Sequence, residues 1–165
     1  MDPRVKASAT DLEQLFQAQS RLASMMIKST HAINEAHSLH QQLEKLSAQA
    51  NDPLLSSFKE LDKKGSAVLS GSAGDTPMGP SLTSVNGSVS ALYAELDRAD
   101  AMPTSAQMEA VAKIEKDFSG VAEQWDQLKS QELATLNNRL RGANRPEIHL
   151  DPHGQSEEGE DQDID

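Results

Sequence analysis

The sequence contains no cysteine. Disulfides and thiolate metal sites are therefore excluded, and the chain is compatible with either redox compartment. Aromatic residues make up only 3% of the chain, which is dominated by alanine, leucine, glutamine, serine, glutamate and lysine. Half-buried strands favour aromatic and β-branched residues, so this balance indicates helices instead. We expect an all-α fold.

Long hydrophobic runs are also missing. No stretch approaches the roughly 18 uncharged apolar residues that a transmembrane helix requires. The first residues, MDPRVKASATDLEQ, lack the apolar core of a secretory signal. We therefore expect no membrane insertion, and the sequence leaves the localisation open.

An excess of basic residues is absent as well, because the formal net charge is −11. Seven acidic residues and no lysine or arginine lie in residues 151–165, which leaves 19 acidic against all 15 basic residues in the rest of the chain. A nearly balanced body offers no basic face for phosphates, so nucleic acid is not expected as a partner. The acidic end has too little apolar surface to offset the entropy of ordering, which predicts disorder.

The first predicted helix covers residues 11–50. Its apolar residues recur mostly three, four or seven positions apart. Thr10 or Asp11 is the predicted N-cap, with Gln14 completing a capping box. ANDPL ends this helix, and Asp52 and Pro53 are well suited to start the next one.

The remaining helices are separated by clear breaks. A second helix follows Pro53, with its apolar stripe interrupted by DKKG, and the glycine- and proline-rich segment 71–80 is predicted to be loop. A third helix over 82–99 has apolar residues alternately three and four apart, although Gly87 weakens it. In LYAELDRADAMPTSAQ, Pro103 stops this helix and Thr104 with Gln107 caps the next.

The last predicted helix covers residues 105–141. Its apolar set changes register after KSQE, and Gly142 is a plausible C′ residue. The short link between the third and the last predicted helix predicts that these two helices lie side by side and antiparallel.

The fold class is thus an antiparallel helical bundle of two long and two short helices. The short pair either doubles back, giving four helices in cross-section, or runs end to end, giving three. The predicted domains are a linker (1–10), the bundle (11–142) and a disordered acidic tail (143–165).

Candidate chemistry is sparse. His37 and His40 share a helix face and His31 lies one turn or more away, but a metal site needs a third ligand and supporting partners that the sequence does not identify. We interpret them as surface or interhelical histidines, and His149 and His153 likewise suggest no defined site. We expect no catalytic, cofactor-binding or metal-binding residue and no cofactor. Met25, Met26 and Ile27 broaden the apolar surface of the first helix and fit either core or a docking surface.

Several segments together resemble a known family. They are MDPRVKASATDLEQLFQAQ, INEAHSLHQQLEKL, LYAELDRADAMPTSAQ and WDQLKSQELATLNNRLRGANRPEI, in this order. They are similar to the C-terminal helical region of bacterial sortilin-like BNR-repeat β-propeller proteins, which are often labelled glycosyl hydrolases. The resemblance covers roughly residues 1–150, and the segment MGPSLTSVNGS departs from the family pattern.

The resemblance implies a non-catalytic accessory or interaction module belonging to a longer, secreted or periplasmic parent. Any hydrolase activity would be expected on the propeller, so no catalytic residue carries over to this chain. The expected partner is the parent's β-propeller domain or another protein. Two alternatives stay open: a glycosidase-like hydrolase, as the family label suggests, and an autonomous dimerising or chaperone-like bundle that forms homo-oligomers.

Overall fold

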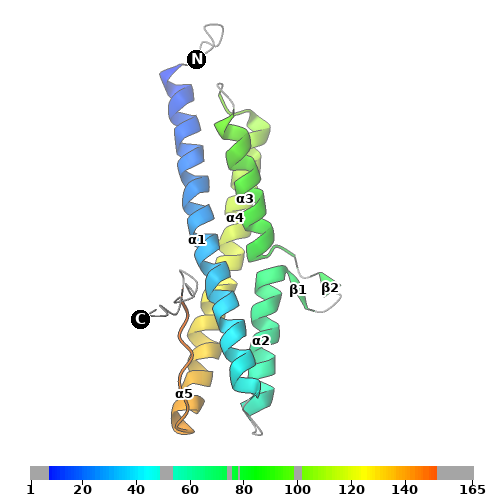
Figure 1. Cartoon of the computed structure of the whole chain (residues 1–165). Coiled ribbons are helices and arrows are strands. Elements are labelled where there is room, and N and C mark those ends of the chain that lie inside the picture. The colour runs from blue at the N-terminus through cyan, green and yellow to red at the C-terminus, as the bar shows by residue number, and fades with distance from the viewer. Residues whose placement is uncertain (1–7, 49–53, 74–75, 78, 99–101, 152–165) are drawn as a thin grey trace, which may run out of the picture.

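The computed structural model describes residues 8–48, 54–73, 76–77, 79–98 and 102–151. The chain forms an antiparallel helical bundle, as predicted (Figure 1). One long helix descends the bundle, two short helices ascend it one after the other, and a second long helix descends again. The short helices lie end to end, so the bundle has three helices in cross-section. The elements are α1 (Ala9–Ala48), α2 (Leu54–Ser70), β1 (Ser72–Ala73), β2 (Thr76–Pro77), α3 (Leu82–Asp97), α4 (Ser105–Gln127), η1 (Leu128–Leu133) and α5 (Ala134–Gly142).

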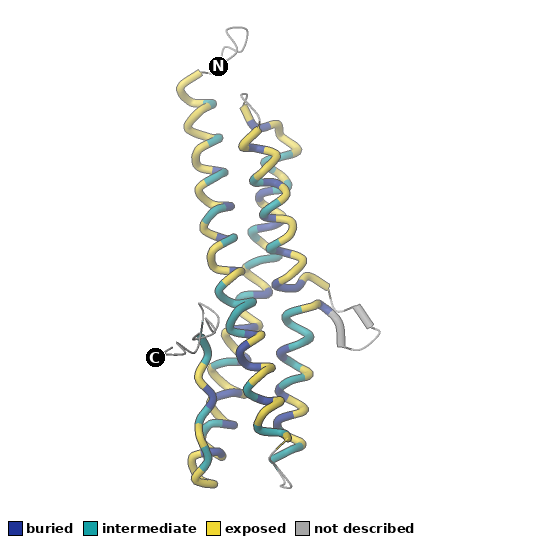
Figure 2. Tube along the Cα trace, viewed as in Figure 1, coloured by how far each residue is buried: buried dark blue, intermediate teal, exposed yellow. Residues whose placement is uncertain are grey.

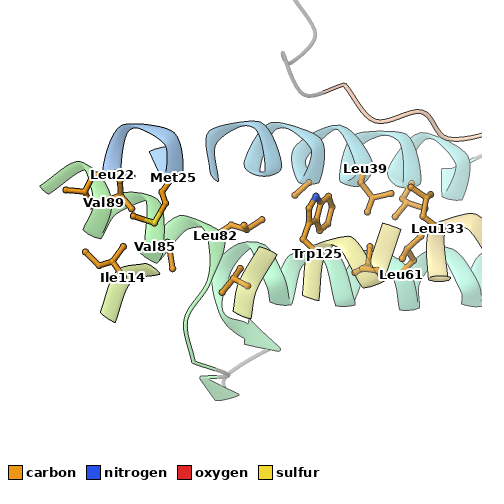
Figure 3. Close-up of a cluster of buried hydrophobic side chains, with 14 of the residues drawn as sticks. Leu22, Met25, Leu39, Leu61, Leu82, Val85, Val89, Ile114, Trp125 and Leu133 are labelled. Carbon is orange, nitrogen blue, oxygen red and sulfur yellow. The ribbon is translucent and has the colours of Figure 1, made fainter. Parts of the chain in front are cut away.

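A continuous apolar core follows the bundle axis (Figure 2). Leu22 of α1 and Val89 of α3 are fully buried in the upper half, and Leu39 of α1 lies with Leu61 of α2 in the lower half (Figure 3). Trp125 of α4 is only 1% exposed and lies between these two halves. The apolar periodicity of the sequence therefore marks the faces that meet in the core.

Capping residues set the helix starts. The predicted box at the α3–α4 turn is confirmed, because the Gln107 amide donates to Thr104 Oγ1 at 3.2 Å and the Thr104 amide donates to Gln107 Oε1 at 2.8 Å. The predicted N-cap of α1 was wrong by two or three residues. Ser8 and Asp11 exchange these bonds instead, at 2.9 and 3.2 Å, since Asp11 reaches back from the first turn. Asp52 and Pro53 lie outside the described residues.

The connection between α2 and α3 bends sharply. Gly71 has φ 76°, and a Cβ there would lie 2.8 Å from the carbonyl oxygen of Gly79, so only glycine fits. The segment predicted as loop contains the two-residue strands β1 and β2, which pair antiparallel. Ser81 then caps α3 together with Ser84, and the helix runs through Gly87 as predicted.

A π-helical turn interrupts the last predicted helix. The segment η1 forms where the apolar pattern changes register, because Leu128 and Leu133 are five residues apart and both are buried. A regular α-helix returns to the same face after about four residues, whereas a π-helical turn with i→i+5 hydrogen bonds returns after five. The π-helical turn thus accommodates one additional residue without rotating the apolar face. The register change after KSQE thus has a local structural cause.

The ordered chain continues beyond the predicted boundary at 142. Gly142 was predicted as C′, but Asn144 takes that position with φ 55°. Its amide and that of Arg145 donate to the carbonyl groups of Arg141 and Leu140, which is a Schellman motif. Residues 145–151, which we call the C-terminal strap, then run back beside α5 (Figure 1).

Side-chain amides hold the strap in place. Asn137 exchanges two hydrogen bonds with the backbone of Ile148, at 2.9 and 3.0 Å, and Gln42 exchanges two with the backbone of His149. Ile148 is 2% exposed and belongs to the core. Residues 143–151 are therefore part of the bundle, which corrects the predicted domain boundary. The acidic residues 152–165 lie outside the described part.

Candidate functional site

The histidines of α1 do not form one cluster. His37 and His40 line a hollow of about 330 Å³ between α1 and α2, whereas His31 lines a different hollow beside α4. His40 Nδ1 lies 2.6 Å from Asp62 Oδ1, and this hydrogen bond raises the pKa of His40 above 6.5 despite partial burial. Within the described part of the chain, no group of three potential metal ligands comes together. His153 lies outside that part.

The densest polar arrangement surrounds Glu35 in the middle of the bundle. Glu35 Oε2 accepts hydrogen bonds from the Trp125 indole at 2.7 Å and from Lys129 Nζ at 2.9 Å. The Lys129 ammonium also lies 3.2 Å from Asp126 and 5.9 Å from the centre of the Trp125 ring, within cation–π distance. We call Glu35, Trp125, Asp126 and Lys129 the Glu35 cluster. It ties α1 to α4 next to the break between α2 and α3.

The electrostatics of this cluster are those of a structural contact. Burial works to lower the pKa of Lys129, but the hydrogen bonds to Glu35 and Asp126 outweigh it and raise the pKa above its ordinary value. Lysine that serves as a base or nucleophile is tuned in the opposite direction. The cluster therefore holds a lysine–carboxylate ion pair at the edge of a hollow of about 390 Å³.

Sequence reasoning missed the Glu35 cluster. One signal was present, because Glu35 is the only acidic residue between Glu13 and Glu44 in α1. Its partner, Lys129 of η1, is far away in the sequence, and only the packing of α1 against the α4–η1 segment brings the two together.

Two further hollows lie along α2: one of about 310 Å³ between α2 and the η1–α5 segment, and one of about 400 Å³ between α2 and the α4–η1 segment. Lys64 Nζ lies 2.6 Å from Glu132 Oε1 and lines the larger hollow with it. Arg139 donates to Ser57 Oγ at 3.1 Å in the smaller one. The charged groups Lys64, Glu132 and Arg139 therefore have partners inside these hollows, and in the described part no buried side-chain nitrogen or oxygen lacks a partner.

The outer face of the first half of α1 carries exposed apolar side chains. Among the described residues four large hydrophobic side chains are exposed, and three of them lie in the first half of α1: Leu12 at 42%, Phe16 at 68% and Ile27 at 58%. At about 100° per residue, Phe16 and Ile27 point away from the buried Met25. We define the outer face as Leu12, Phe16, Ala23 and Ile27. Met25 is buried in the core and Met26 packs against it, whereas Ile27 belongs to the outer face.

In the described chain, no helix has the length and apolarity needed to span a membrane. No protein-family model matches the sequence, and comparisons with curated proteins and with solved structures found no match.

Proposed function

We propose that this chain is a non-catalytic helical interaction module that binds another protein chain through the outer face of α1. The observation that carries the proposal is the exposure of Phe16 at 68% between Leu12 and Ile27. Burying a large aromatic side chain away from water is favourable in free energy. Surfaces that are rich in aromatic residues and methionine and carry few charges are typical of interface centres. Between Gln14 and Ile27, Arg21 is the single charged residue.

The polar chemistry of the described bundle supports a structural role. Its carboxylates, such as Glu35 and Glu132, are paired with lysines at 2.9 and 2.6 Å. A glycosidase needs two carboxyl groups facing one another across a cleft at a fixed separation, one of them with a raised pKa. The resemblance to the helical end of sortilin-like propeller proteins supports the same proposal, with the module serving a longer parent whose chemistry lies on the propeller.

Site-specific photocrosslinking tests the interaction. A benzophenone amino acid replaces Phe16 in the full chain expressed in cells, and the matched control carries it in place of Gln41, an exposed residue in the lower half of α1. We expect protein adducts from position 16 and none from position 41. Absence of any adduct at position 16 contradicts the proposed face.

A hydrolysis assay tests the non-catalytic part of the proposal. The purified chain is incubated with nitrophenyl glycosides, and we expect no release of nitrophenol above the buffer. Hydrolysis that is lost when one acidic residue, such as Glu132, is changed to glutamine would favour the hydrolase alternative instead.

A further inference from the structure

The outer face of α1 has an internal symmetry. Leu12 and Ile27 are equally distant along the chain from the midpoint between Gln19 and Ser20, and Phe16 and Ala23 are equally distant from the same midpoint. A twofold axis through this point would place Phe16 of one copy against Ala23 of a second copy, and Leu12 against Ile27. A surface that complements itself in this way is what a twofold contact between identical chains requires.

We infer that the outer face of α1 binds a second copy of this chain, with the two α1 helices antiparallel. The inference rests on the proposed function, because it names the partner of the same face. The Phe16 ring of each copy would pack over the smaller, half-buried Ala23 of the other copy, and Leu12 would face Ile27. Ser20, which is exposed near the midpoint, would lie beside Ser20 of the second copy.

Charge complementarity selects the antiparallel orientation. Glu13 lies beside one end of the face, and Lys28 lies near the other end, on the flank of α1 that turns toward α4; both are exposed. In the antiparallel pair, Glu13 of one copy comes within about 3 Å, measured along the helix axis, of Lys28 of the second copy. Parallel pairing would place Glu13 beside Glu13 and bring two positive helix N-termini together, which is unfavourable.

The size of the contact predicts a weak dimer. From Leu12 to Ile27 the face is about 22 Å long, which is short for a stable interface. We therefore expect an apparent mass that rises with concentration in light scattering rather than a permanent dimer. Phe16→Glu should weaken this self-association at least tenfold, at about the level of an interface hot spot, whereas Gln41→Glu should leave it unchanged.

Disulfide crosslinking tests the arrangement directly, because the chain has no cysteine of its own. Under mild oxidation we expect the Ser20→Cys variant to form disulfide-linked dimers. The Ala23→Cys and Gln41→Cys variants should stay monomeric, since Ala23 lies about 10 Å along the axis from its counterpart in the antiparallel pair. Circular dichroism melting confirms that each variant is folded.

The outcomes separate this inference from the proposed function. Crosslinking of both Ser20→Cys and Ala23→Cys indicates parallel pairing and overturns the antiparallel arrangement. A chain that stays monomeric at all concentrations, without crosslinking at Ser20→Cys, overturns self-association. If the photocrosslinker at position 16 then captures a different protein, the interaction module stands and the second copy is excluded as its partner. If it captures nothing, both fail.

Discussion

At the scale of single residues, Glu35 connects α1 with residues 90 and 94 positions further along the sequence. Its carboxylate is the acceptor for both the Trp125 indole and Lys129. Trp125 is 1% exposed, so its N–H cannot turn to water if the acceptor is removed. The cost of a change at Glu35 therefore depends on whether a hydrogen-bond acceptor stays near the indole.

We expect Glu35→Ala to lower the free energy of unfolding by about 1–3 kcal/mol, because a buried donor loses its partner. Glu35→Gln keeps an oxygen near the indole and removes one partner of a partly buried ion pair while Asp126 stays beside Lys129, so it should cost less, about 1 kcal/mol. Urea unfolding followed by the fluorescence of Trp125, the single tryptophan, measures both. Equal losses in the two variants would show that the indole hydrogen bond contributes nothing.

His40 gives the bundle a small dependence on pH. Its pKa is raised in the folded state by the hydrogen bond to Asp62, so folding favours the protonated imidazole. The resulting stabilisation is fully present below the ordinary pKa of 6.5 and is lost as the pH rises through the higher folded value. Because both side chains are partly exposed, the effect should be below about 1 kcal/mol.

The matching experiment compares the wild-type chain with His40→Gln across this pH range. We expect the difference in unfolding free energy to shrink as the pH rises. NMR titration of His40 in the Asp62→Asn variant should return its pKa toward 6.5, which is the control for the assigned partner. A His40 titration that is unaffected by Asp62→Asn would contradict this cause.

At the scale of elements, η1 lets the apolar faces of α4 and α5 both point into the core. A regular α-helix over the same residues would rotate one of these faces away from the core. Leu128 and Leu133 both face the core because a π turn lies between them. A regular α-helix brings residues four apart onto the same face, so removing one residue from η1 would restore α-helical spacing without rotating α5.

We expect deletion of Ser130, an exposed residue of η1, to cost less than about 2 kcal/mol. Deletion of Glu123, an exposed residue in the regular part of α4, should cost more than about 4 kcal/mol, because it rotates every later apolar residue by about 100°. Thermal unfolding of the two variants measures the contrast. Equal destabilisation would mean that η1 is needed for another reason than register.

At the scale of the whole molecule, the C-terminal strap closes the lower half of the bundle. Ile148 is buried against the core, and four hydrogen bonds between the strap backbone and the side chains of Asn137 and Gln42 fix the strap. The strap backbone forms these hydrogen bonds with side-chain amides instead of with a neighbouring strand or helical turn. An extended segment is therefore held in place without belonging to a sheet.

Two truncations test this role. A chain that ends after Asn144 loses Ile148 and its hydrogen bonds, and we expect the unfolding free energy to fall by about 2–3 kcal/mol. A chain that ends after Asp151 keeps the whole strap and should stay within about 0.5 kcal/mol of the full chain. Urea unfolding compares the two. If both truncations are equally stable, the strap does not contribute to the core.

The sequence by itself determined the helices and their direction. Apolar spacing, the Thr104–Gln107 box and the prolines are local signals, and they set which residues face inward and where α3 and α4 meet. Even the register change at η1 is visible in the spacing of the leucines. Tertiary structure decided what depends on distant partners: the end-to-end placement of α2 and α3, the pairing of Glu35 with Lys129, and the docking of Ile148. It also decided that Phe16 stays exposed, because a periodic pattern shows which residues share a face but not which face another helix will cover.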